Sequence, residues 1–362
     1  MKNIQKKILL VFIYCVLFLL CLEGSARFIL LYTPFLDSKT IRSDPYFRLK
    51  LVRASYHKDK ESFLSGNYLY EPLRGWALKP NLNIGNAGRP DKILHTNSKG
   101  IRGVSEYTYQ KQSSKKRILI LGDSFTFGDE ASDNVTYPYY LEKMVPGLEV
   151  LNFGVNGYGH DQMLLYLKEE GIRYKPDIVV LGFAPTGLSR NMSLCYRLPK
   201  PKFVLVDNKL QLTNVPVPTI SSIISQEIFK PKIIDWLLMI QAEHGDKTHF
   251  IKERKQLTEA IFDEMLKTIR ECGAEPLFVY ISTPLAMSKN NPKEEKPFED
   301  FFEQFCKERN IPHLFTRPYF NAVKQKGIQL KKIGHWDAQG NQIVAQVIAE
   351  YLCQGKMKTA SQ

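Results

Sequence analysis

Five short apolar runs, separated by helical patterns, leave few folds open to the chain after residue 110. The runs cover residues 118–121, 148–153, 177–183, 277–282 and 312–315, and each is apolar and β-branched or aromatic enough to be a buried strand. Between them apolar residues recur at helical spacing, as at Phe262, Met265 and Ile269. Strands that alternate with helices predict an α/β three-layer sandwich with a five-stranded parallel sheet.

Two segments depart from this alternation. Residues 33–110 are rich in Tyr, Pro, Arg and Lys and predict an irregular lead-in region with short strands. Residues 199–255 contain a hairpin pattern followed by a long helical stretch, and they predict an insertion in an α/β domain that covers residues 111–355. Ligands of such sheets bind beyond the carboxyl ends of the strands, and the polar loop at 284–297 is a second candidate for the rim.

The N-terminus carries an unbroken apolar run from Ile8 to Leu22, with three lysines before it. A spanning helix needs about 20 mainly apolar residues, so residues 1–32 predict a cytoplasmic N-terminus and a signal-anchor transmembrane helix. The positive-inside rule then places the rest of the chain outside the cytoplasm. A cleaved signal peptide is the alternative, although Ser25-Ala26 offers only a weak cleavage site.

The charge balance and the cysteines exclude some classes of partner. With 50 Lys+Arg against 37 Asp+Glu, the chain carries +13 and favours anionic surfaces. The basic residues are scattered and no zinc-finger spacing occurs, so we expect no nucleic-acid partner. Cys195, Cys272, Cys306 and Cys353 are far apart and predict no metal site, and the sequence leaves open whether they form disulfides. No cofactor is indicated.

A serine that could act as a nucleophile follows the first run, in the sequence G-D-S-F-T-F-G at residues 122–128. At a strand-to-helix turn such a serine can attack a carbonyl if a base and an oxyanion hole lie nearby. The second run ends in the glycine-rich segment 152–159, where the N–H of Gly157 can approach a reacting group. His335 stands just before the last helical pattern and is a candidate base.

Taken in this order, these motifs resemble the SGNH, or GDSL-type, hydrolase superfamily, and more closely its membrane-anchored bacterial branch. The resemblance covers residues 68–352, and it implies a bacterial inner membrane with the α/β domain facing the periplasm. It implies an SGNH-hydrolase-like fold with Ser124 as nucleophile, His335 as base, and the N–H groups of Ser124 and Gly157 in the oxyanion hole. It also implies action on acyl esters, with acetyl groups of an envelope glycan or lipid as the expected substrates and envelope-assembly proteins as candidate partners.

Two positions differ from the family pattern. The asparagine that the family places in its oxyanion hole is replaced here by Thr186, whose shorter hydroxyl is the candidate third donor. The aspartate that usually precedes the catalytic histidine is replaced by Lys332 and Ile333. We therefore predict a Ser-His dyad. Asp161 and Asp337 are the acids closest to the motifs, and what orients the imidazole stays open.

Other polar residues near the motifs have plainer interpretations. His160 is interpreted as a residue at a helix N-terminus, and Asp123 as structural. Arg102 and Arg190 could bind an anionic substrate, but surface arginines usually do not.

Two functions from different classes are consistent with these motifs. The first is an extracytoplasmic serine esterase or O-acyltransferase, whose two forms share one acyl-enzyme and differ only in the acceptor. The alternative is a catalytically impaired SGNH-like domain that binds or scaffolds in envelope polysaccharide assembly, motivated by the two departures from the family pattern. The oligomeric state is open.

Overall fold

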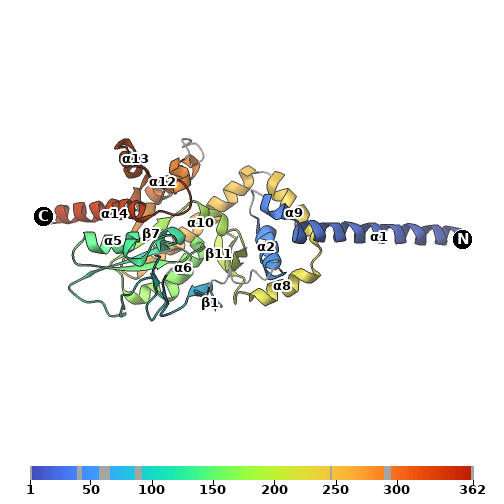
Figure 1. The fold of residues 1–362 in the computed structure, drawn as a ribbon, viewed down its shortest axis with the longest axis horizontal. Coiled ribbons are helices and arrows are strands. Elements are labelled where there is room, and N and C mark those ends of the chain that lie inside the picture. Colours follow the sequence, from blue (N-terminus) through green and yellow to red (C-terminus); the bar gives the residue numbers. More distant parts are fainter. Residues whose placement is uncertain are drawn as a thin grey trace.

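The structure is a computed structural model that describes residues 2–38, 43–56, 66–85, 92–244, 247–288 and 295–359. One long helix, α1 (Lys2–Tyr32), projects from the body of the molecule (Figure 1). The most apolar 18 residues within Asn3–Tyr32 have a mean hydropathy of 2.5, and among the described helices α1 is the one long and apolar enough to cross a membrane. Glu23 and Arg27 form an ion pair at 2.7 Å without interrupting the helix.

A five-stranded parallel sheet forms the centre of the body. Its strands are β5 (Lys116–Gly122), β6 (Leu148–Gly154), β7 (Ile178–Phe183), β12 (Glu275–Tyr280) and β13 (His313–Phe315), in the order β13-β12-β7-β5-β6. Gly122 at the end of β5 is paired with Gly154 on one side and with Gly182 on the other. The chain moves from β5 to β6 and then crosses to β7 on the opposite side, so a topological switch point lies at the carboxyl end of β5.

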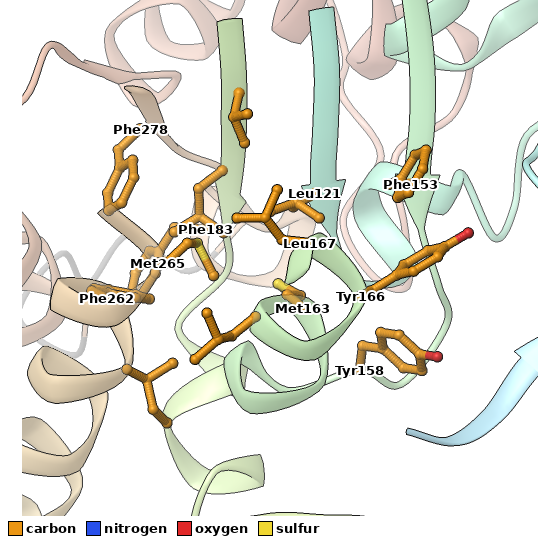
Figure 2. Close-up of a cluster of buried hydrophobic side chains, with 14 of the residues drawn as sticks. Leu121, Phe153, Tyr158, Met163, Tyr166, Leu167, Phe183, Phe262, Met265 and Phe278 are labelled. Atoms are coloured by element: carbon orange, nitrogen blue, oxygen red, sulfur yellow. The ribbon is translucent and has the colours of Figure 1, made fainter. Parts of the chain in front are cut away.

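Helices cover both faces of the sheet, because successive strand residues point to opposite sides. One face is covered by α6 (His160–Glu169), α10 (Lys247–Glu271) and α12 (Lys296–Glu308), and the other by α5 (Tyr137–Met144), α13 (Arg317–Gln325) and α14 (Ala338–Thr359). Figure 2 shows Leu121 and Phe183 of the sheet meeting Met163 of α6 and Phe262 of α10. The expected three-layer α/β sandwich with five parallel strands is confirmed.

The lead-in region contains the expected short strands and one helix that the sequence did not reveal. The strands form two hairpins, β1 (Tyr68–Glu71) with β2 (Gly75–Leu78) and β3 (Asn83–Ile84) with β4 (Leu94–His95). After the 3-10 helix η1 (Pro34–Ser38) comes α2 (Asp44–Tyr56). The residues that α2 buries include the neighbours Leu51 and Val52 as well as Tyr46 and Leu49, so its apolar residues form no single stripe at helical spacing.

Residues 199–255 contain the expected hairpin and helices. Two short strands, β8 (Cys195–Tyr196) and β9 (Leu198–Pro199), lead into the hairpin β10 (Lys202–Val206) and β11 (Lys209–Thr213), and the helices α8 (Ile220–Phe229) and α9 (Lys232–His244) follow before α10. The hairpin turn has positive φ at Asp207 and Asn208, which is the geometry that two-residue hairpins favour.

Short helices follow the strands at the carboxyl edge of the sheet. These are α4 (Ser124–Phe127) after β5, α7 (Thr186–Arg190) after β7 and α11 (Pro284–Ser288) after β12. The 3-10 helix η2 (Asp133–Val135) precedes α5, and η3 (Gly171–Tyr174) precedes β7. The candidate rim loop at 284–297 lies partly outside the described residues, which resume at residue 295.

Candidate active site

Ser124 is the first residue of α4, directly beyond the central strand β5 and at the switch point of the sheet. The turn is tight because the Asp123 carboxylate accepts the N–H of Phe125 at 3.0 Å. The carbonyl of Ser124 accepts the N–H groups of Gly128 and Asp129, each at 3.0 Å. The serine is therefore held on both sides, and Asp123 has the structural role expected of it.

His335 and Ser124 are 211 residues apart in the sequence but in contact in the structure. Its Nε2 lies 2.7 Å from the Ser124 Oγ, within hydrogen-bond distance. The next residue, Trp336, fixes this segment, since its indole N–H donates to the Ser282 carbonyl at 2.9 Å and its ring stacks on Phe320 at 4.1 Å. The sequence-predicted nucleophile and base are thus brought together at the carboxyl edge of the sheet.

Two carboxylates that the sequence analysis missed lie on the other side of the imidazole. The Nδ1 of His335 is 3.7 Å from the Asp129 Oδ2 and 3.7 Å from the Glu130 Oε1. Both acids directly follow the 122–128 motif, and that position, together with the missing acid before the histidine, was the signal available in the sequence. Glu130 also pairs with Lys331.

Asp161 and Asp337, the two acids considered from the sequence, make contacts away from the imidazole of His335. Asp337 accepts the N–H of Gly340 at 3.0 Å and so caps α14. Asp161 is completely buried and pairs with Lys200, which is also completely buried. These positions correct the interpretation of Asp161 and Asp337 as the nearest acids.

The electrostatics favour a neutral imidazole. Burial lowers the pKa of His335 below the usual value of 6.5, with the charges of Asp129 and Asp123 opposing that shift. A neutral imidazole whose Nε2 faces a hydroxyl is the form that can accept the hydroxyl proton. The charges of Asp129 and Asp123 would stabilise the imidazolium that forms once His335 has taken the proton.

The candidate oxyanion donors follow three neighbouring strands. Ser124 follows β5, Gly157 follows β6 and Thr186 begins α7 after β7, so all three lie at one edge of the sheet. Gly157 has φ +85°, and a Cβ there would lie 3.4 Å from Trp76 and 3.5 Å from Tyr196. Thr186 is exposed at the start of its helix.

Both arginines named from the sequence are buried, which corrects their interpretation as surface residues. Arg190 donates to the Asp123 carboxylate at 2.7 Å and to the Tyr158 carbonyl at 2.9 Å. Arg102 donates to Asp133 at 2.8 Å and to backbone carbonyls of residues 127, 128 and 131. They fix the turn that holds Ser124 and the loop that carries Asp129.

His160 is the first residue of α6, as its interpretation as a helix N-terminal residue predicts. It is also completely buried. Its ring stacks on Phe183 at 5.3 Å, and burial lowers its pKa to about 3. A Cβ at Gly187 would lie 2.3 Å from this ring. The imidazole therefore fills the space that a side chain at position 187, next to Thr186, would need.

Within the described residues, no group of three or more His, Cys, Asp or Glu side chains is placed to hold a metal ion. The six cysteines are free thiols, including the buried Cys195 and Cys306.

No protein-family model matches the chain, and no curated protein does either. Several solved structures are similar to it. A protein described as an acylhydrolase from Bacteroides fragilis has 12% identity and a TM-score of 0.40, with 68% of this chain and 90% of that chain covered. A protein described as a lipolytic member of the G-D-S-L family from Desulfitobacterium hafniense has 13% identity and a TM-score of 0.41, covering 65% and 99%.

An acetylxylan esterase from Geobacillus stearothermophilus has 15% identity and a TM-score of 0.41, with 67% of this chain and 95% of that chain covered. Sequence identities and TM-scores this low do not carry a functional argument. The function is therefore argued from the geometry around Ser124 and His335.

Proposed function

We propose that this chain is an SGNH-type serine esterase or O-acyltransferase, anchored by α1 with its α/β domain outside the cytoplasm. The observation that carries the proposal is the 2.7 Å contact between the Ser124 Oγ and the His335 Nε2 at the switch point of the sheet. A half-buried imidazole with a lowered pKa beside a serine hydroxyl is the arrangement that activates a nucleophile.

The reaction runs through an acyl-enzyme. The Ser124 Oγ attacks the ester carbonyl carbon while its proton passes to the His335 Nε2, and the N–H groups of Ser124 and Gly157 hold the oxyanion. As the tetrahedral intermediate collapses, the bond to the alcohol oxygen breaks and His335 protonates the leaving alcohol. Water or a sugar hydroxyl then attacks the acyl-enzyme and gives its proton to His335. As the bond between the acyl carbon and the Ser124 Oγ breaks, His335 returns that proton to the Oγ, and the carboxylic acid or the new ester is released.

Asp129 is the acid that we assign to the imidazole. It lies as close to the Nδ1 as Glu130 does, but Glu130 is paired with Lys331, so Asp129 has the less compensated charge. The distance of 3.7 Å exceeds a hydrogen bond, and catalytic contacts are often longer before substrate binds. Asp129 is thus a positioning residue that replaces the missing family aspartate.

The proposed substrate class is an acyl ester, with acetyl preferred, on a glycan or lipid of the cell envelope. Two things support it: the resemblance of the motifs, and the net charge of +13, which favours approach to anionic surfaces. Envelope-assembly proteins are the proposed partners. Hydrolase and transferase differ in whether water or a sugar hydroxyl reaches the acyl-enzyme.

The test is covalent labelling of the detergent-solubilised full chain with a fluorophosphonate, located by mass spectrometry. We expect the label on Ser124, its loss in Ser124→Ala, and a strong reduction in His335→Ala. A folded protein that takes up no label, or that labels equally without His335, would contradict the proposal. That outcome would favour the alternative of a binding or scaffolding domain, because Thr186 offers a weaker donor than the family asparagine and a lost donor costs about 2.7–4 kcal/mol in the transition state.

A further inference from the structure

The α8–α9 corner carries exposed apolar side chains at the base of α1. We call six of them the apolar tip, and they are Ile228, Phe229, Ile234, Leu237, Leu238 and Ile240. Phe229 is 85% exposed and Leu237 is 60% exposed. Ile234, Leu237 and Leu238 share one side of α9, while Asp235 and Met239 on the other side are buried. Soluble proteins rarely gather apolar side chains in this way without a partner.

The apolar tip is attached directly to α1. The Arg27 guanidinium donates to the carbonyl of Ile228 at 2.9 Å and to that of Lys230 at 3.2 Å. The Glu23 carboxylate accepts the N–H groups of Lys232 at 2.9 Å and Ile233 at 3.1 Å, at the start of α9. These contacts fix the height of the tip along α1, and Figure 1 shows the α8–α9 turn at the end of the body from which α1 projects.

That height coincides with the outer edge of the proposed membrane span. The hydrocarbon core is about 30 Å thick, which corresponds to about 20 helical residues at 1.5 Å each. If the span begins at Ile8, after the lysines, it ends near Arg27. Glu23 would then lie about 6 Å below the outer edge, within the ~5–10 Å depth that interfacial helices reach.

The charges near the apolar tip are compensated by one another. Lys232 pairs with Glu227 at 2.7 Å and with Asp235 at 3.2 Å, and these three side chains are at most 4% exposed. Lys230 also pairs with Asp235, and Arg48 of α2 pairs with Asp44, Glu227 and Asp235. The network contains three basic and three acidic groups. A bilayer penalises uncompensated charge, so this balance suits a surface that enters lipid.

We propose that the apolar tip inserts into the outer leaflet beside α1 and holds the α/β domain against the membrane at a second point. The inference rests on the proposed anchoring by α1. The occupant is lipid acyl chains, because the tip continues the exposed apolar surface of α1 at the level where that surface leaves the bilayer. Phe28 and Tyr32, which are exposed on the last turns of α1, then lie at the headgroups, where aromatic side chains gather.

The test places an indole on the apolar tip of the full chain. Phe229→Trp is reconstituted into vesicles of phosphatidylcholine and phosphatidylglycerol, recovered by flotation, and measured with lipid brominated in the acyl chains. The matched control is Val104→Trp, at a residue that is 71% exposed in the loop after β4. We expect brominated lipid to quench the added fluorescence at position 229 and to leave that at position 104 unchanged.

The other outcomes overturn the proposal. Protein that floats with the vesicles but shows no quenching at position 229 has its tip in water. If Phe229→Glu converts a dimer into a monomer in detergent, the surface belongs to a second copy of the chain. Protein that does not float has no anchor in α1, and the inference fails with it. Turnover of a soluble acetyl ester by Phe229→Glu is read separately, so failure here is distinct from failure of the esterase proposal.

Discussion

At the scale of single residues, the imidazole of His335 stands between a hydroxyl and two carboxylates. Its Nε2 faces Ser124, and its Nδ1 lies 3.7 Å from both Asp129 and Glu130. The carboxylates differ in their own partners, because Glu130 pairs with Lys331. This difference makes their roles separable by mutation.

Asp129→Asn is expected to lower kcat for an acetyl ester by roughly 10- to 100-fold, less than the ~10⁴-fold loss of a hydrogen-bonded triad acid. The Asp129 charge raises the pKa of His335. Its removal lowers that pKa further, so less imidazole is protonated at a given acidic pH and the acid limb of the kcat profile moves to lower pH. Rates measured from pH 5 to 9 test both effects.

Glu130→Gln and Asp337→Asn are the controls for this prediction. Each removes one carboxylate near His335 in space or in sequence, and we expect kcat within a few fold of the unmodified chain. A kcat and an acid limb that are both unchanged in Asp129→Asn would contradict the assigned role. A greater loss in Glu130→Gln would transfer that role to Glu130.

At the scale of elements, the segment before α14 depends on Gly334. This residue has φ +76°, and a Cβ there would lie 2.5 Å from the Glu130 Oε1. Gly334→Ala should therefore strain the backbone beside His335 and push the far end of the Glu130 side chain aside, and we expect kcat to fall a few-fold through displacement of His335 while the protein stays folded, since the residue is exposed. Activity and thermal unfolding are measured together.

Gly327→Ala is the matched control. Gly327 has a similar φ of +77°, but nothing lies within 4 Å of its Cβ position. The two variants thus carry the same backbone strain and differ in the collision with Glu130. Equal activity in the two variants would show that backbone strain, and not displacement of His335, controls the site.

The turn between β5 and α4 depends on the buried pair of Arg190 and Asp123, whose side chains are 7% and 2% exposed. Arg190→Met leaves the carboxylate buried without its partner, which typically costs about 3–5 kcal/mol of folding free energy. We expect this loss in urea unfolding, together with reduced fluorophosphonate labelling of Ser124. Adding Asp123→Asn should recover part of the stability, and a double variant no more stable than the single one would contradict this account.

The sequence predicts the elements better than it predicts their contacts. Strands β5, β6, β7 and β12 are buried on both faces over most of their length, so each leaves a continuous apolar run, and the half-buried edge strand β13 leaves a shorter one. Helix α2 buries apolar residues on more than one side and leaves no helical stripe. A local sequence pattern therefore reveals a strand that is apolar throughout or a helix with one apolar stripe, but not a helix that is buried on several sides.

In the candidate site, too, local motifs are predicted and contacts between distant residues are not. Ser124 and His335 stand in recognisable local motifs, and the sheet topology brings both to one edge. The approach of Asp129 to His335 joins residues 206 positions apart, and no local pattern encodes it. The burial of Arg190 is also a tertiary property, since its partner Asp123 belongs to a different strand connection.

At the scale of the whole molecule, a helix long and apolar enough to cross a membrane and the pair of Ser124 and His335 belong to one connected structure. The helices α8 and α9, which lie between β7 and β12 in the sequence, bind α1 through Glu23 and Arg27. In this account, α8 and α9 join the proposed anchor α1 to the α/β domain. Domain and anchor would then keep a fixed distance between the membrane and Ser124.

The most direct measurement is to trap the acyl-enzyme. The full chain is mixed with an excess of an activated acetyl ester, quenched in acid within the first turnovers, and digested for mass spectrometry. The account predicts one acetyl group on the peptide that carries Ser124, absent in Ser124→Ala and strongly reduced in His335→Ala. Turnover of the ester with no acetyl group on Ser124, or an unchanged yield without His335, would contradict it.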